Sequence, residues 1–166
     1  ANHQSHADLA MIWAALPEEL RSITRPIAAR DYWTKTDFKR WITTAVFNAV
    51  YVDRERQGDE DPLQPLIDAL QSGDSLIIFP EGTRGHAAEP QAFKAGLYNL
   101  ALRFPDVVLV PAWIANVQRV MPKGEVVPVP VLCSVTFGAP IRLEPGEERR
   151  AFLDRARAAV IALRDV

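Results

Sequence analysis

The first residues of the chain place a histidine and a carboxylate at a spacing that suits proton transfer. His3 and Asp8 are five positions apart, across the junction between a loop and an expected helix. Ser5 is a good N-cap, and Ser5-x-x-Asp8 fits the capping-box pattern at a helix end that favours a carboxylate. A carboxylate that accepts from one imidazole nitrogen leaves the other free to take a proton. The pattern predicts a base with its orienting group, and a plain helix cap at Asp8 is the alternative.

A second set of candidate residues follows a short apolar run. The sequence FPEGTR occupies positions 79–84, directly after an expected buried strand. Gly82 lets the backbone approach a ligand, and the N–H groups around it are expected to be exposed. Arg84 offers a planar guanidinium that suits a phosphate. The alternative is an ordinary turn in which Glu81 and Arg84 pair with each other.

Alternating helices and strands are expected to position these residues. Strands that alternate with helices predict an α/β fold with a single, largely parallel sheet flanked by helices. Such sheets bind ligands at the carboxyl ends of their strands, where Asp53-Arg54 and FPEGTR stand, and Lys94 precedes another helix. Apolar periodicity, caps and breakers predict helices at 8–16, 37–48, 62–73, 95–104 and 147–163, strands at 49–52, 75–79, 107–114 and 129–137, and mixed structure at 17–31.

Composition limits the class of protein. The 166 residues are 48% hydrophobic and 24% charged, which predicts one globular domain over residues 1–166. A net charge of −2 argues against a general nucleic-acid binder, and a single cysteine, Cys133, excludes an intrachain disulfide and a Cys-rich zinc site. No stretch approaches the roughly 18 consecutive apolar residues of a membrane-spanning helix. Because the chain begins at Ala1 without an initiator Met or signal peptide, we expect a piece that lacks an N-terminal segment.

The order of these motifs resembles the 1-acylglycerol-3-phosphate O-acyltransferase family of glycerolipid acyltransferases. Four blocks carry the resemblance: NHQSHAD at 2–8 with its His-x4-Asp motif, VYVDR at 50–54, FPEGTR at 79–84 and VLVPA at 108–112. The sequences at 119–124 and 135–141 also look like the family. Two departures concern blocks near the acceptor: the glycine usual in the second block appears as Asn48 or is absent, and the fourth block ends VPA where VPV is commoner.

The resemblance implies transfer of a fatty acyl group from acyl-CoA, or from acyl carrier protein, to a hydroxyl of lysophosphatidic acid, a related lysophospholipid or glycerol phosphate. His3 would be the base and Asp8 would hold its imidazole, while backbone N–H groups around Gly82 would stabilise the oxyanion. The donor is a co-substrate, and no resident cofactor, metal or acyl-enzyme is implied. Arg54 and Arg84, with Lys94, would clamp the acceptor phosphate. The expected substrate-binding residues are Arg54, Glu81, Gly82, Thr83, Arg84 and Lys94.

Lipid substrates imply a membrane surface as a partner, and no nucleic acid. We expect this piece to associate peripherally with the cytoplasmic face of a membrane, through aromatic residues such as Trp33, Phe38 and Trp41, while the parent chain can carry membrane segments. Two other functions stay open. One is a catalytically silent module that binds lipid or phosphate with the same fold. The other is a metal-dependent hydrolase with His3, His6 and Asp8 as ligands, which leaves the FPEGTR motif without a role.

Overall fold

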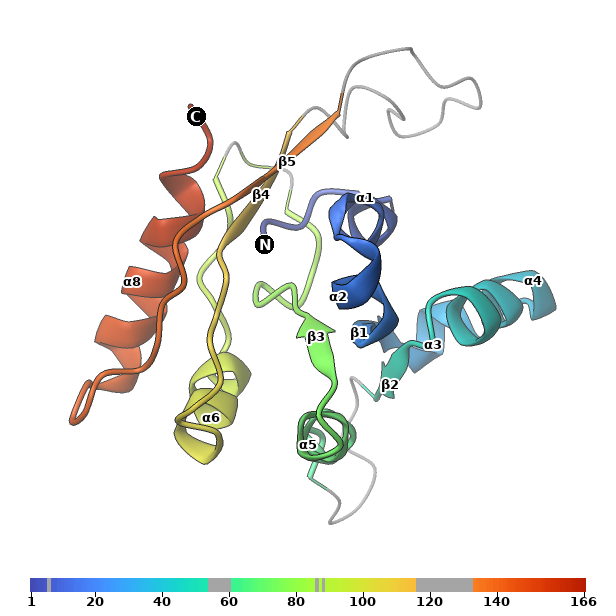
Figure 1. Ribbon diagram of the computed structural model, residues 1–166, viewed down its shortest axis with the longest axis horizontal. Helices are drawn as coiled ribbons and strands as arrows, with labels where there is room; N and C mark the ends of the chain where they lie inside the picture. The colour runs from blue at the N-terminus through green and yellow to red at the C-terminus, as the bar shows by residue number, and fades with distance from the viewer. Residues whose placement is uncertain (6, 54–60, 86, 88, 116–132) are drawn as a thin grey trace. The chain divides into compact units, whose positions relative to one another are not determined.

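The computed structural model describes residues 1–5, 7–53, 61–85, 87, 89–115 and 133–166. They form two compact units. Figure 1 shows the path of the chain, coloured by residue number. The terminal unit consists of Ala1–Ala15 together with Phe79–Val166, and the central unit consists of Leu16–Ile78. The single domain expected over residues 1–166 stays a prediction.

A three-stranded parallel sheet organises the central unit. β1 (Thr24–Ala29) lies between β2 (Val50–Val52) and β3 (Ser75–Ile77), with Ile27 opposite Val50 and Thr24 opposite Ser75. Burial alternates along β1, as expected for a strand whose two faces have different neighbours. The flanking helices are α2 (Glu18–Ser22), α3 (Arg30–Trp33), α4 (Asp37–Trp41) and α5 (Gln64–Gln71). The α/β prediction, with parallel strands flanked by helices, is confirmed.

Local sequence signals explain where the central helices begin and end. The Asp61 carboxylate accepts a hydrogen bond from the Leu63 N–H at 2.9 Å, just before α5, and Gly73 follows that helix with a φ of +88°. The helix expected over 37–48 is α4 continued by one π-helical segment, η1 (Ile42–Val46). Asn48 then has a φ of +47°, a conformation that glycine adopts freely and asparagine tolerates. Asn48 therefore adopts a backbone conformation in which a glycine would also fit.

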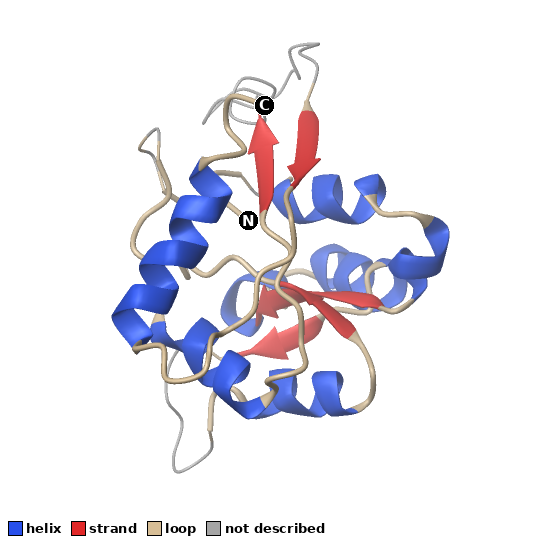
Figure 2. Ribbon diagram, turned by 60° about the vertical axis from the view of Figure 1, so that its left-hand side comes forward, coloured by secondary structure: helices blue, strands red, loops and turns tan. Residues whose placement is uncertain are grey.

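The terminal unit contains a two-stranded antiparallel pair. β4 (Ala112–Ala115) pairs with β5 (Ser134–Phe137), and Figures 1 and 2 show α1 (Asp8–Ala15) and α8 (Arg149–Ile161) on either side of this pair. The strands are shorter than expected at 107–114 and 129–137, and part of the second range lies outside the described residues. Pro111 has no N–H to donate to a ladder, and β4 begins just after it.

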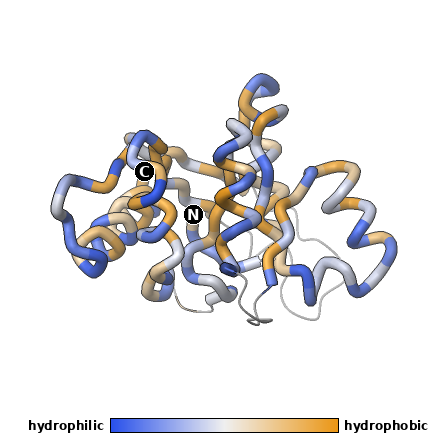
Figure 3. The backbone as a smooth tube through the Cα atoms, turned by 90° about the horizontal axis from the view of Figure 1, so that it is seen from below, coloured by the Kyte–Doolittle hydropathy of each residue, from blue (hydrophilic) through white to orange (hydrophobic). Residues whose placement is uncertain are grey.

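Packing between helices builds the core of the terminal unit. Phe152, Ala156 and Val160 recur every four residues along α8 and are all buried. The Phe152 ring lies 5.9 Å from that of Tyr98 on α6 (Ala95–Arg103). Figure 3 shows the helical backbone changing between hydrophilic and hydrophobic residues along its length, as expected of helices with one buried face. None of the described helices has the length and hydropathy to span a bilayer.

Candidate active site

The structure brings His3 and Asp8 into direct contact in the terminal unit. The His3 Nδ1 atom lies 3.0 Å from Asp8 Oδ2, and the Asp8 side chain is only 2% exposed. The same oxygen accepts the N–H groups of Gln4 at 2.6 Å and Ser5 at 2.8 Å. The Ser5 hydroxyl in turn accepts the Ala7 N–H at 3.2 Å, so the carboxylate half of the expected capping box is present, while the serine caps the N–H one residue earlier than expected. Asp8 therefore both caps the helix and holds the imidazole.

This arrangement leaves one imidazole nitrogen of His3 available for proton transfer. Because the Asp8 carboxylate can only accept hydrogen bonds, the hydrogen between the two side chains belongs to His3 Nδ1. The other ring nitrogen, Nε2, is then left as an acceptor. The ring stacks on Phe79, with centroids 4.3 Å apart and 21° between the planes. The His3 side chain is 22% exposed, so a substrate can reach a ring whose orientation is fixed on two sides.

Glu81 is buried and joins two segments of backbone to the FPEGTR turn. Its side chain is 1% exposed, and its two oxygens accept the N–H groups of His3 and Gln91, each at 2.8 Å. The Gly85 N–H donates to the His3 carbonyl at 2.9 Å, which adds a second link between the turn and the residue carrying the imidazole. A Cβ on Gly85 would lie 3.1 Å from Glu81 Oε2, so glycine suits this crowded position. Glu81 thus holds the backbone, and its direct contact with substrate stays a prediction.

Gly82, Thr83 and Arg84 are exposed in the turn, and Lys94 lies beside them. Gly82 has a φ of +73°, and the stem of Lys94 passes 3.4 Å from where a Cβ on Gly82 would stand. The Gly82 N–H donates to the Phe79 carbonyl at 3.0 Å, so it is occupied within the turn and not available to an oxyanion. The Thr83 N–H donates no hydrogen bond within the described part of the chain, so it is the more available of these two backbone donors.

Two of the predicted ligands cannot be placed. Arg54, expected at the acceptor phosphate, lies outside the described residues, and so does His6, a ligand of the metal-dependent alternative. Among the residues that the structure describes, no three His, Cys, Asp or Glu side chains gather in a way that could hold a metal ion.

Asn2 has a structural role that sequence reasoning missed. Its buried amide donates from Nδ2 to the Ile114 carbonyl at 3.0 Å and accepts the Ile114 N–H at 2.8 Å on Oδ1. The side chain thereby bonds to β4 as a neighbouring peptide group would. The available signal was an asparagine directly before the candidate base, because an amide side chain carries a donor and an acceptor in the arrangement of a peptide group.

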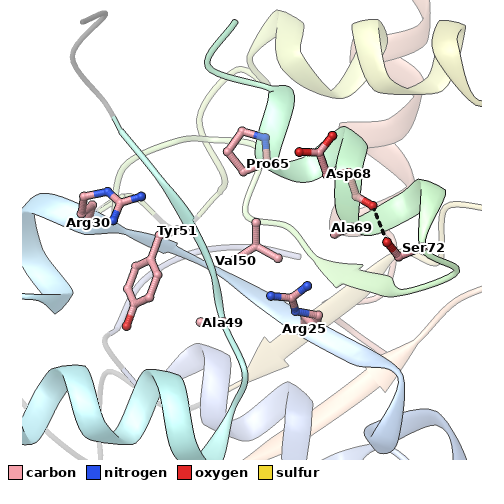
Figure 4. Close-up of a pocket in the computed structure, with 9 residues that line it drawn as sticks. All are labelled: Arg25, Arg30, Ala49, Val50, Tyr51, Pro65, Asp68, Ala69 and Ser72. Carbon is pink, nitrogen blue, oxygen red and sulfur yellow. Dashed lines mark hydrogen bonds between the residues drawn. The ribbon is translucent and has the colours of Figure 1, made fainter. Parts of the chain in front are cut away.

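A separate surface pocket of about 370 Å³ lies in the central unit, between α5 and the strands β1 and β2. Figure 4 shows Val50 in the middle of the pocket, with Arg25 and Arg30 on either side. Arg25 donates to Asp74 at 3.1 Å, and Arg30 pairs with Asp53 at 3.2 Å. These carboxylates offset both arginines, and the pocket contains none of the site residues expected from the sequence. Its lining residues are Arg25, Arg30, Ala49, Val50, Tyr51, Pro65, Asp68, Ala69 and Ser72.

The fold is that of a solved acyltransferase. The crystal structure of PlsC, the 1-acyl-sn-glycerophosphate acyltransferase from Thermotoga maritima, superposes with a TM-score of 0.73 at 23% sequence identity. The superposition covers 99% of this chain and 63% of that one. At this level of identity, the comparison establishes the fold.

The family follows from the sequence matches. The family model described as Acyltransferase matches residues 1–115, well over half of the chain. The chain therefore belongs to the Acyltransferase family, which confirms the resemblance seen in the motif blocks.

Curated relatives agree with this assignment. The 1-acyl-sn-glycerol-3-phosphate acyltransferase alpha of Mus musculus is 31% identical over 129 residues, covering 75% of this chain and 42% of the relative. The Homo sapiens protein of the same name is 29% identical over 169 residues, covering 98% and 56%. The Dictyostelium discoideum protein named Taffazin is 30% identical over 142 residues, covering 78% and 48%. The chain spans about half the length of the curated relatives it matches.

Proposed function

We propose that this chain transfers a fatty acyl group from acyl-CoA or acyl carrier protein to the hydroxyl of lysophosphatidic acid or a related lysophospholipid. The observation that carries the proposal is the contact between His3 and the buried Asp8, with Nδ1 and Oδ2 3.0 Å apart. Lipid binding alone requires no oriented base, whereas activation of a hydroxyl does. Further support comes from the Mus musculus and Homo sapiens relatives, which are named as 1-acyl-sn-glycerol-3-phosphate acyltransferases.

In the proposed reaction, His3 Nε2 takes the proton of the acceptor hydroxyl as its oxygen attacks the thioester carbonyl. Asp8 keeps the ring in the required tautomer and stabilises the imidazolium that forms. The tetrahedral intermediate then collapses, the carbon–sulfur bond breaks, and the departing thiolate takes the proton from His3. The ester, the free thiol and a neutral His3 are the products. A positioned base of this kind contributes roughly 10²–10⁴-fold to the rate.

The FPEGTR turn supplies the remaining groups of the proposed site. The Thr83 N–H is the backbone donor best placed to stabilise the oxyanion, since the Gly82 N–H is already bonded within the turn. Arg84 and Lys94 would bind the acceptor phosphate, together with Arg54. The position of the Lys94 stem over Gly82 supports this part of the proposal, because it brings a second cation to the turn that holds Arg84.

The acyl donor would act as a co-substrate, and the chemistry requires no resident cofactor or metal. Lysophospholipids partition into bilayers, and acyl-CoA and acyl carrier protein are cytoplasmic molecules. We therefore place the proposed reaction at the cytoplasmic face of a membrane.

A thiol-release assay tests the proposal. The chain is supplied with acyl-CoA and, in turn, lysophosphatidic acid, glycerol 3-phosphate or lysophosphatidylcholine. We expect acceptor-dependent release of free thiol, with lysophosphatidic acid preferred, and a loss of at least about 10²-fold in His3→Ala. Circular dichroism confirms that the variant is folded. A wild-type chain that binds lipid without releasing thiol would instead be the silent module, and substantial activity in His3→Ala would remove the histidine from the mechanism.

A further inference from the structure

Two aromatic side chains lie together on the exposed face of α4. Phe38 is 69% exposed and Trp41 is 58% exposed. Their rings are stacked, with centroids 6.4 Å apart and 23° between the planes. Val46, at the end of η1, is a further apolar residue with 43% of its surface exposed. Clustered apolar side chains that remain exposed on a folded unit are typical of a contact surface.

The opposite face of the same helical segment is fixed to the sheet. Thr43 is fully buried, and its hydroxyl bonds both to the Lys39 carbonyl at 2.9 Å and to the Tyr51 hydroxyl on β2. The Thr44 hydroxyl lies 3.1 Å from the same Tyr51 oxygen. Figure 1 shows α4 on the other side of β2 from α5. Because this side is anchored, the helix cannot rotate to bury Phe38 and Trp41 without breaking these bonds.

The aromatic pair lies within a basic segment of a chain that is acidic as a whole. Residues 34–46 contain three basic and one acidic side chain, whereas the whole chain has 19 Lys and Arg against 21 Asp and Glu. Lys35 and Arg40 are exposed, Arg40 pairing with Asp37 one turn away, and Lys39 lies 3.9 Å from the Tyr32 ring centre. Exposed aromatic rings bordered by cations match the interface of a bilayer that carries anionic headgroups.

We propose that this face of α4 docks the chain onto a bilayer that contains anionic phospholipid. Phe38 and Trp41 would enter the boundary between headgroups and acyl chains, while Lys35 and Arg40 would lie at the phosphates. The inference rests on the proposed function in one respect, that a lipid acceptor gives the chain a reason to meet a bilayer. The docking itself requires no chemistry at His3.

Vesicle flotation without any acyl donor tests the docking. The vesicles contain phosphatidylcholine either alone or mixed with phosphatidylglycerol. We expect the chain to float with the mixed vesicles and the Phe38→Ser/Trp41→Ser double variant to lose roughly tenfold or more in binding. Leu102→Ser is the matched control, because Leu102 is 54% exposed on α6, and it should bind as the wild type does. His3→Ala should also bind normally, which separates failed docking from failed catalysis.

Tryptophan fluorescence provides a second measurement if the double variant is poorly folded. Acyl chains labelled with bromine should quench the emission of the wild type, and Trp41→Phe should lose most of that quenching while it still floats. The Lys35→Gln/Arg40→Gln double variant should bind the mixed vesicles more weakly than the wild type does. Its binding to vesicles of phosphatidylcholine alone should not change. Flotation of the folded double serine variant at the wild-type level would overturn the proposal. So would a wild-type dimer that never floats and dissociates in the double variant, since a second copy would then cover this face.

Discussion

At the scale of single residues, the hydrogen bonds of Asp8 converge on one oxygen. Oδ2 accepts from the His3 ring and from two backbone N–H groups, whereas Oδ1 is buried and accepts no hydrogen bond from the described residues. The geometry required of Asp8 is therefore supplied by a single acceptor atom. Its negative charge is a separate property, and a substitution can remove the charge while keeping the acceptor.

The substitution Asp8→Asn removes the charge and keeps the acceptor, because an amide oxygen in the place of Oδ2 can accept hydrogen bonds from the same three donors. We expect the variant to fold with α1 intact, and kcat for thiol release to fall about 10²–10⁴-fold because the imidazolium loses its counter-charge. Asp8→Ala should lose the cap as well and be less stable by about 1 kcal/mol. Steady-state kinetics and thermal unfolding check both statements. A kcat near the wild-type value in Asp8→Asn would show that orientation alone is sufficient.

We infer that Glu81 acts by positioning the backbone, since both of its oxygens are bonded to backbone N–H groups. Glu81→Gln replaces one acceptor with an NH₂ group that faces a backbone donor, which should cost about 1–3 kcal/mol of stability. We expect kcat to fall while KM changes little, because the backbone that carries His3 shifts and no substrate contact is lost. Kinetics over a range of acceptor concentrations measures the two constants. A raised KM with an unchanged kcat would instead indicate that Glu81 binds the acceptor.

At the scale of elements, a bidentate ion pair fixes the start of α8. Arg155 donates from Nε and Nη2 to the two carboxylate oxygens of Glu147, at 2.8 Å and 2.7 Å, and Nη2 also donates to the Arg142 carbonyl. The hydrogen bond from Arg155 lowers the pKa of Glu147 below its ordinary value of 4.5, and the same contact raises the pKa of Arg155. The pair thus joins the loop before α8 to the second turn of the helix.

The lowered pKa of Glu147 predicts a dependence of stability on pH. Its contribution is fully present above the ordinary carboxyl pKa and is lost as the pH falls through the lower, folded-state pKa. Glu147→Gln should therefore be less stable than the wild type by about 0.2–1 kcal/mol at neutral pH. The difference should shrink progressively below about pH 4. Urea unfolding of both proteins at neutral and acid pH measures this, and a difference that stays constant would contradict it.

Local sequence signals explain how well the elements were predicted. Asp61 and Gly73 bound α5, and Pro105 follows soon after α6, so these helices lie within two or three residues of their expected ends. The short helices α2 and α3 have five and four residues, too few for an apolar period to appear. The antiparallel pairing of β4 with β5 depends on partners distant in sequence, which the pattern of either strand alone does not specify.

At the scale of the whole molecule, the motifs singled out the residues of the proposed site but did not predict their distant bonding partners. The contact between His3 and Asp8 is local, and both residues were expected in the site. The bonds from Glu81 to His3 and from Asn2 to Ile114 span 78 and 112 positions, and only the fold brings these residues together. Gly82 illustrates the same limit, because its type was informative while its N–H proved to be occupied within the turn.

The bond between Asn2 and Ile114 constrains the amino-acid sequence unequally at its two ends. At position 114 only the backbone N–H and carbonyl take part, and every residue type except proline supplies both. At position 2 the side chain must present a donor and an acceptor at the distance of an asparagine amide. As far as this bond is concerned, we therefore expect related chains to vary more freely at position 114 than at the asparagine next to the proposed base.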